Sequence, residues 1–276
     1  MNTAFRIVNR HRDAIRCNLH LPPETAGAPI VLLCHGFKGF KDWGLFPYAA
    51  EHFALKGFVA IRFDFSLNGV EEVDGEFTAL ERFARNTVGR ELDDLDDLVN
   101  AVMEGDVVPD DCDRGRIMLV GHSLGGGVAI VHAAEDPRIA AVATWAGVAD
   151  FMRWGKKTRA AWRKTGRLEI ENTRTGQKMP MDVVMLDDLE ANVARYDILA
   201  AAARLARPLL VLHGEQDVSV PLDEGRRIIA AADSSLSRMH VLPNTDHTFG
   251  ARHPFEGSTT ALKTVLTESI RHFRNV

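Results

Sequence analysis

The sequence has few cysteines, no excess of basic residues and no long apolar run. Its three cysteines, Cys17, Cys34 and Cys112, are too few and too scattered for a disulfide framework or a zinc site. The formal net charge of −5 argues against a nucleic-acid-binding protein, because such proteins usually carry a basic surface. No apolar stretch approaches the length of a membrane-spanning helix, and residues 1–17 lack the apolar segment of a secretory signal. We therefore expect a cytoplasmic protein with no nucleic-acid partner and no membrane span; the sequence leaves the oligomeric state open.

Apolar strand-like runs alternate with helical segments along the 276 residues, 46 % of which are hydrophobic. The run 30–34, Ile-Val-Leu-Leu-Cys, is unbroken and apolar, which is typical of a strand buried in a parallel sheet. Strands are predicted over 4–8, 14–21, 30–34, 58–63, 116–120, 139–145, 208–213 and 237–242, and the main helices over 46–56, 87–104, 128–135 and 258–273. This order predicts one α/β fold: a mostly parallel eight-stranded sheet with helices on both faces and the opening hairpin as its antiparallel edge.

The helix predicted over 87–104 carries Asp93, Asp94, Asp96 and Asp97. These residues fall mainly away from the apolar stripe of the helix. A metal site is one interpretation, but a solvated helix face explains them without any ligand, and we prefer it. We therefore predict no metal site.

Almost sixty residues separate two predicted core strands, over 148–206. This connection is far longer than an ordinary one, so we expect an inserted cap over the ligand-binding edge of a core formed by 1–147 and 207–276. A small hairpin is expected from Leu168–Glu171 and Gln177–Met181. A surface excursion without a role is the alternative.

The first half of this insertion is basic, with Arg153, Lys156 and Lys157 among its cations. This charge suggests an acid-bearing substrate, although a solvated surface explains it equally well. An aromatic-accepting pocket is a further hypothesis, for which the candidate residues are Trp145, Trp154 and Trp162. For Trp145, core packing is the stronger expectation.

The segment VGHSLGGGVAI, residues 120–130, contains a serine flanked by glycines two places before and after it. Ser123 stands between a predicted strand and a predicted helix. Such a sharp reversal crowds the backbone, and Gly121 and Gly125 relieve the crowding. The pattern G-x-S-x-G in this setting is a nucleophile elbow, although an ordinary turn also fits the pattern alone.

A serine nucleophile needs a base to take its proton and a carboxylate to orient that base. Asp217 follows the strand predicted over 208–213, and His247 follows the strand predicted over 237–242. The order Ser123, Asp217, His247 is the one found on this architecture. We therefore predict these three residues as the catalytic triad.

Other residues are weaker candidates for the same roles. Glu215 is the credible substitute for Asp217, whereas Asp246 adjoins His247 and is poorly placed to orient its own neighbour. His240 lies inside a predicted strand and His253 has no strand to fix its position. His122 is expected to point away from the reacting face.

Acyl transfer also needs amide donors for the developing oxyanion. The residue after the nucleophile supplies one, which is the Leu124 N–H. The second is expected from His35-Gly36-Phe37, after the strand over 30–34, where the Phe37 N–H is the favoured donor. His35 itself is expected to serve packing or hydrogen bonding.

The segments HGFKG (35–39), GHSLGG (121–126), GEQD (214–217) and DHTF (246–249) resemble the α/β-hydrolase superfamily. With the insertion, the chain is similar to bacterial carboxylesterases of the feruloyl/cinnamoyl esterase and dienelactone-hydrolase-like groups. The resemblance implies an α/β-hydrolase fold and a serine hydrolase of small carboxylic esters that needs no cofactor. A peptidase or amidase, an acyltransferase and a non-catalytic ligand-binding protein of this fold are the alternatives.

Overall fold

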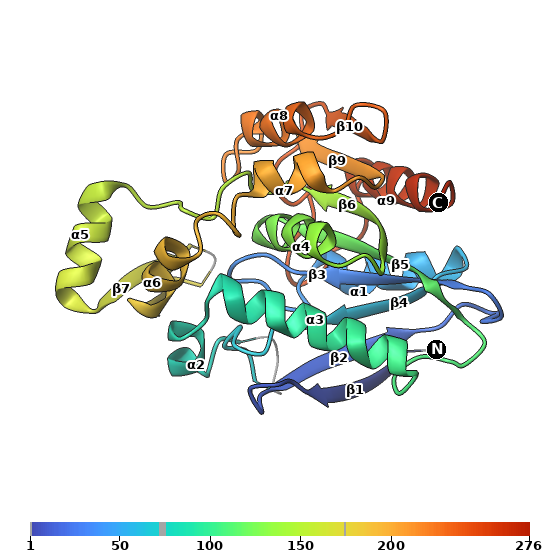
Figure 1. Cartoon of the computed structure of the whole chain (residues 1–276), viewed down its shortest axis with the longest axis horizontal. Coiled ribbons are helices and arrows are strands. Elements are labelled where there is room, and N and C mark those ends of the chain that lie inside the picture. Colours follow the sequence, from blue (N-terminus) through green and yellow to red (C-terminus); the bar gives the residue numbers. More distant parts are fainter. Residues whose placement is uncertain (1, 72–75, 174) are drawn as a thin grey trace.

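The computed structural model describes residues 2–71, 76–173 and 175–276, and its central feature is one eight-stranded sheet (Figure 1). The strand order is β1-β2-β4-β3-β5-β6-β9-β10. The strands are β1 (Asn2–Val8), β2 (Ala14–His20), β3 (Pro29–Cys34), β4 (Val59–Phe63), β5 (Asp113–His122), β6 (Ile139–Trp145), β9 (Leu209–Gly214) and β10 (Ser237–Leu242). From β4 to β10 every neighbouring pair is parallel, whereas β2 pairs antiparallel to β4 and β1 pairs antiparallel to β2. The predicted mostly parallel sheet with an opening hairpin is confirmed.

Helices cover both faces of this sheet, as predicted (Figure 1). On one face α1 (Leu45–Leu55) packs on α9 (Thr260–Phe273). On the other, α4 (Leu124–Glu135) lies between α3 (Val88–Glu104) and α7 (Ile198–Arg204), and α7 packs on α8 (Leu222–Ala231). Within the described residues, every helix is too short or too polar to traverse a lipid bilayer.

The middle of the sheet is buried on both sides. All residues of β4 and β9 are buried, which agrees with their mostly apolar sequences. Parallel register places the ends of neighbouring strands level, pairing Cys34 with Gly121 across β3 and β5. The residues that follow β3, β5, β9 and β10 therefore meet along a single edge of the sheet.

A second unit projects from this body between β6 and α7 (Figure 1). It contains α5 (Lys156–Thr165), the two-stranded sheet of β7 (Arg167–Asn172) and β8 (Gln177–Asp182), and α6 (Val184–Ala191). We call residues 156–191 the arm. The hairpin expected from 168–171 and 177–181 is present as β7 and β8, whereas α7, within the same insertion, packs against α4.

The aspartates of α3 differ from the expected solvated face. Asp94 is fully buried and accepts hydrogen bonds from Asn9 Nδ2 (2.6 Å) and the Ser66 N–H (2.7 Å). The turn between β1 and β2 covers this part of the helix, and its Arg10 binds Asp97 (2.6 Å). The prediction failed because the covering turn comes from a distant part of the chain, which helical periodicity does not reveal.

Candidate active site

Ser123 occupies the single residue between the end of β5 and the start of α4. Its backbone has φ 57° and ψ −120°, a conformation that L-residues rarely adopt. The turn is also tightly packed: a Cβ on Gly125 would lie 2.7 Å from the Cys34 carbonyl oxygen, and one on Gly121 would lie 2.6 Å from the Gly126 Cα. The sharp strand-to-helix reversal therefore requires glycine at both flanking positions.

Asp217 lies in the loop after β9, and each of its two carboxylate oxygens has its own hydrogen-bond partners. Its Oδ1 accepts hydrogen bonds from the N–H groups of Ser219 and Val220, each at 2.9 Å, and its Oδ2 lies 2.7 Å from His247 Nδ1. Burial alone would raise the pKa of Asp217, but the His247 contact and the Val220 amide outweigh it and lower that pKa. The carboxylate thus stays ionised and binds the imidazole through Nδ1, with Nε2 on the opposite side of the ring.

A cavity of about 550 Å³ brings the predicted residues together at this edge of the sheet. Ser123 and His247 both border it, and so do Phe37, after β3, and Leu124, the first residue of α4. An amide in the first turn of a helix has no carbonyl acceptor within that helix and lies at its positive end. The Leu124 N–H is therefore suited to receive negative charge formed beside Ser123.

The rest of the cavity wall divides into apolar and polar parts. The apolar part contains Trp43, just before α1, and Phe46, in the first turn of α1. The loop after β9 adds Val218. The end of β7 and the turn after it, in the arm, supply Asn172 and Thr173. The tryptophans proposed for this wall lie elsewhere: Trp145 is buried and binds Ser269 (3.0 Å), and Trp154 packs on Trp162 at 5.1 Å. The tryptophan that borders the cavity is Trp43, which the sequence analysis did not select.

Several cations in the basic half of the insertion pair with neighbouring acids. Arg163 of α5 pairs with Asp187 (2.9 Å) and Glu190 of α6. Among the cations singled out from sequence, Arg153 borders the cavity, and its guanidinium lies 2.6 Å from both Glu224 carboxylate oxygens. The cation at the cavity wall thus already has an acidic partner within the protein.

His122 does not point away from the cavity as expected. It borders the cavity, its ring centroid lies 4.7 Å from that of His247, and its Nε2 lies 3.0 Å from the His247 carbonyl oxygen. Because a carbonyl only accepts, His122 donates from Nε2. Burial lowers the pKa of His122 to about 3, so it is a neutral support for the loop of His247 rather than a competing base.

The remaining alternatives have other partners. Glu215 is exposed and accepts from the Asn244 N–H (3.2 Å), while Asp246 accepts from the Gly250 N–H (2.7 Å). His240 lies within β10, and His253 accepts from the Gly44 N–H (3.1 Å). His35 links two loops, since its Nδ1 lies 2.9 Å from the Gly36 carbonyl and its Nε2 accepts from the Phe65 N–H (3.1 Å).

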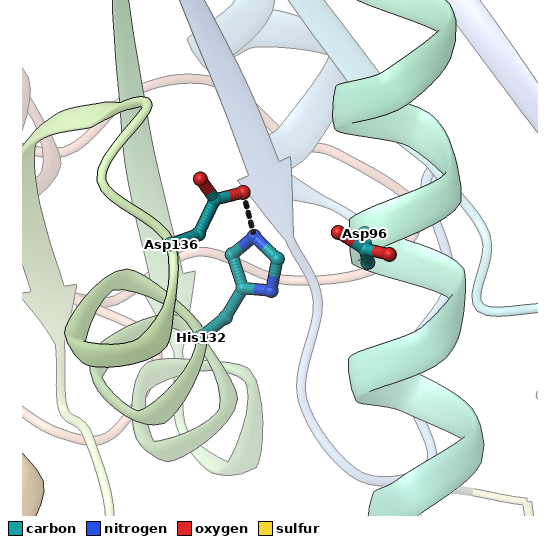
Figure 2. Close-up of side chains that lie close together, drawn as sticks. All are labelled: Asp96, His132 and Asp136. Carbon is teal, nitrogen blue, oxygen red and sulfur yellow. Dashed lines mark ion pairs between the residues drawn. The ribbon is translucent and has the colours of Figure 1, made fainter.

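A second histidine–carboxylate group lies away from this edge (Figure 2). His132 and Asp136, at the end of α4, approach within 3.3 Å, and Asp96 faces them from α3. Their ligand atoms lie within 4.8 Å of one another, close enough to hold a metal ion. However, the Arg138 guanidinium lies 3.0 Å from Asp96 and 2.7 Å from Asp136, so an arginine already supplies the positive charge at this place.

Comparison with known proteins agrees with this architecture. An Escherichia coli protein, described as an uncharacterized 31.7 kDa protein in the traX-finO intergenic region, is 25 % identical over 266 residues, covering 85 % of this chain and 88 % of its own. The crystal structure of a putative hydrolase from Agrobacterium vitis has a TM-score of 0.78 at 16 % identity and covers 99 % of both chains. Est1E from Butyrivibrio proteoclasticus, also solved with ferulic acid bound, has a TM-score of 0.68 at 17 % identity and covers 99 % of this chain and 97 % of its own.

These structures share the α/β-hydrolase fold, which confirms the fold class predicted from sequence. The model of the dienelactone hydrolase family matches residues 16–276, nearly the whole chain. The match spans β2 to α9 and so includes both the sheet edge and the arm. The protein is therefore a hydrolase of the dienelactone hydrolase family.

Proposed function

We propose that this hydrolase cleaves small carboxylic esters through an acyl-enzyme intermediate on Ser123. The observation that carries the proposal is a His–Asp pair and a serine at a strained elbow bordering one cavity. The ordered partners of Asp217 and the position of Leu124 at a helix start add an oriented base and a site for negative charge. In this proposal Asp217 orients the base and His247 is the base.

The reaction follows from these positions. Ser123 Oγ attacks the ester carbonyl while His247 Nε2 takes the hydroxyl proton, and the oxyanion accepts hydrogen bonds from the Phe37 and Leu124 amides. His247 then gives the proton to the leaving alkoxide, and an acyl-Ser123 ester remains. Water attacks that ester with His247 again as base, which releases the acid and restores the serine.

We also propose that the insertion acts as a cap over this cavity. Its arm reaches the sheet edge, where Lys38 Nζ donates to the Glu171 carbonyl (3.0 Å) beside Asn172 and Thr173. It is held farther out by Arg167, which pairs with Glu81 of α2 (Leu80–Ala84) at 2.8 Å. These contacts support a fixed wall against which a substrate is selected.

The test compares wild type, Ser123→Ala and a control, Ser235→Ala, which removes an exposed serine after α8. The substrates are 4-nitrophenyl acetate, butyrate, octanoate and laurate, and methyl ferulate. We expect Ser123→Ala to lower kcat by about 10⁴-fold or more while Ser235→Ala changes nothing. A burst of one equivalent of 4-nitrophenol would report the acyl-enzyme.

Two results would contradict the proposal. Full turnover by Ser123→Ala would exclude Ser123 as the nucleophile. Wild-type inactivity on every ester, with turnover of an amide or of acyl transfer to an added alcohol or thiol, would assign the same residues to a different reaction.

A further inference from the structure

We propose that His213 is a positioning residue that holds the Asp217 carboxylate in its productive orientation. His213 is the residue before the last of β9, and its side chain is fully buried behind Asp217, outside the cavity wall described above. The proposal rests on the proposed function, because it assigns His213 to the same reaction.

Two contacts connect His213 to the loop that carries Asp217. Its Nε2 lies 2.8 Å from the Val220 carbonyl oxygen and 3.5 Å from Asp217 Oδ2. Val220 is also the residue whose N–H donates to Asp217 Oδ1. A single imidazole nitrogen therefore binds the carbonyl of the residue whose N–H donates to one carboxylate oxygen, and it lies beside the other carboxylate oxygen.

These contacts determine which nitrogen carries the proton. With the proton on Nδ1, the Nε2 lone pair would face two acceptors, the Val220 carbonyl and the Asp217 carboxylate. With the proton on Nε2, both become favourable partners. Burial lowers the pKa of His213, so the imidazole is neutral and donates from Nε2.

This arrangement leaves Nδ1 as a buried acceptor, to which no described residue donates a hydrogen bond. Gly225 of α8 packs against it so closely that a Cβ there would lie 2.7 Å from Nδ1. A buried acceptor without a donor destabilises a fold. A hydrocarbon side chain would avoid that cost, so the N–H at Nε2 is the feature that explains a histidine here.

The charged and titratable groups near this pair are few. His247 faces Asp217 from the cavity side, with His122 behind it. From α8, Glu224 faces His213 and is paired with Arg153. Replacing a neutral histidine alters none of these charges directly, so a changed pH profile would report the lost N–H beside Asp217.

The experiment compares His213→Asn with His213→Gln. The amide nitrogen of glutamine reaches about as far as Nε2, whereas that of asparagine stops near the position of Nδ1. Both variants remain polar and similar in size, so their difference isolates the reach of the donor. The matched control is His272→Asn with His272→Gln, because His272 is also buried and its Nε2 lies 3.1 Å from the Val142 carbonyl, away from the cavity.

We expect His213→Asn to lower kcat/KM for 4-nitrophenyl butyrate by roughly tenfold, the effect of one lost neutral hydrogen bond, and His213→Gln to restore most of it. Without the N–H, the Asp217–His247 pair binds a proton more tightly. The midpoint of the acid limb of the kcat/KM profile should therefore rise by about half a unit in His213→Asn. Both His272 variants should leave this midpoint unchanged.

A second readout needs no substrate. The Nδ1 proton shared by His247 and Asp217 gives a low-field proton resonance, which should move in His213→Asn and stay in place in His213→Gln. If the wild type hydrolyses no ester, the proposed function fails, and this resonance still tests the link to Asp217. If esters are hydrolysed and neither the resonance nor the acid limb moves in His213→Asn, or if both His213 variants behave alike, the positioning role is wrong.

Discussion

Two of the histidine–aspartate pairs in the described residues have very different surroundings. His247 and Asp217 lie 2.7 Å apart at the edge of the sheet, beside a serine and an open cavity. His132 and Asp136 lie 3.3 Å apart between helices, where the Arg138 guanidinium binds the carboxylate (Figure 2). In the first pair the described partners of the aspartate are histidines and backbone amides, and in the second the aspartate binds an arginine. The residue types are the same, so the neighbours of the carboxylate distinguish a candidate catalytic pair from a pair that stabilises the fold.

Removing the charge from each aspartate is the strongest test of this contrast. Asp217→Asn should lower kcat by about 10⁴-fold, because the amide would hold the imidazole in the wrong tautomer. Asp136→Asn should leave kcat within about twofold of wild type, since this aspartate lies outside the cavity. Ester hydrolysis assays on both variants provide the measurement. Equal losses in the two variants would remove the distinction.

The two substitutions should rank in the opposite order by their effect on the free energy of unfolding. Asp136→Asn should lower the free energy of unfolding at pH 7 by about 2 kcal/mol, because it weakens a charge-assisted contact with Arg138. Burial alone would raise the pKa of Asp136, but contacts with His132 and Arg138 lower it below its ordinary value.

The sign of the pH dependence follows from this lowered pKa. The stabilisation is present above the unfolded-state pKa of about 3.9 and is lost as the pH falls toward the folded-state value. Urea denaturation at pH 7 and at about pH 3.5 should therefore show a smaller difference in the free energy of unfolding between wild type and Asp136→Asn at the lower pH. Asp110→Asn, at an exposed side chain, is the control. A constant difference at both pH values would mean that ionisation of Asp136 is not the source.

A smaller effect is expected where a cation borders the cavity beside Ser123. Arg153→Gln should change KM for an anionic ester by less than about threefold, because the guanidinium is already engaged by Glu224. The same substitution at Arg159, in the arm, is the control. A rise in KM that is confined to anionic esters would instead show that Arg153 reaches the substrate.

The smallest effect is expected from metal removal. EDTA should leave kcat/KM and Tm unchanged, since Arg138 occupies the position that a cation would take between Asp96 and Asp136. An increase in Tm with added zinc that disappears in Asp136→Asn would show that the second pair binds metal after all.

Local sequence patterns were sufficient to predict the sheet and the chain order of the candidate triad. Strands such as β9 begin with a continuous apolar run, and a loop that carries a candidate site residue follows each of the strands that end at the cavity. What the patterns did not predict depends on contacts between distant segments. The burial of Asp94 needs the turn around Asn9, and the position of His122 needs the carbonyl of His247, 125 positions away. The short helices α5 and α6 were not predicted either, because the arm mixes charged and apolar residues and has no long periodic stretch.

The arm has a consequence for how this enzyme family can diversify. Trp162 of α5 donates to the Met181 carbonyl of β8 (2.9 Å), so the arm is partly held together by its own buried contacts. The elbow and the loops after β9 and β10 are fixed by the sheet instead. Exchanging the arm between relatives would therefore change one wall of the cavity and leave the candidate catalytic residues in place. Recombination of this segment is thus a route to altered substrate selectivity.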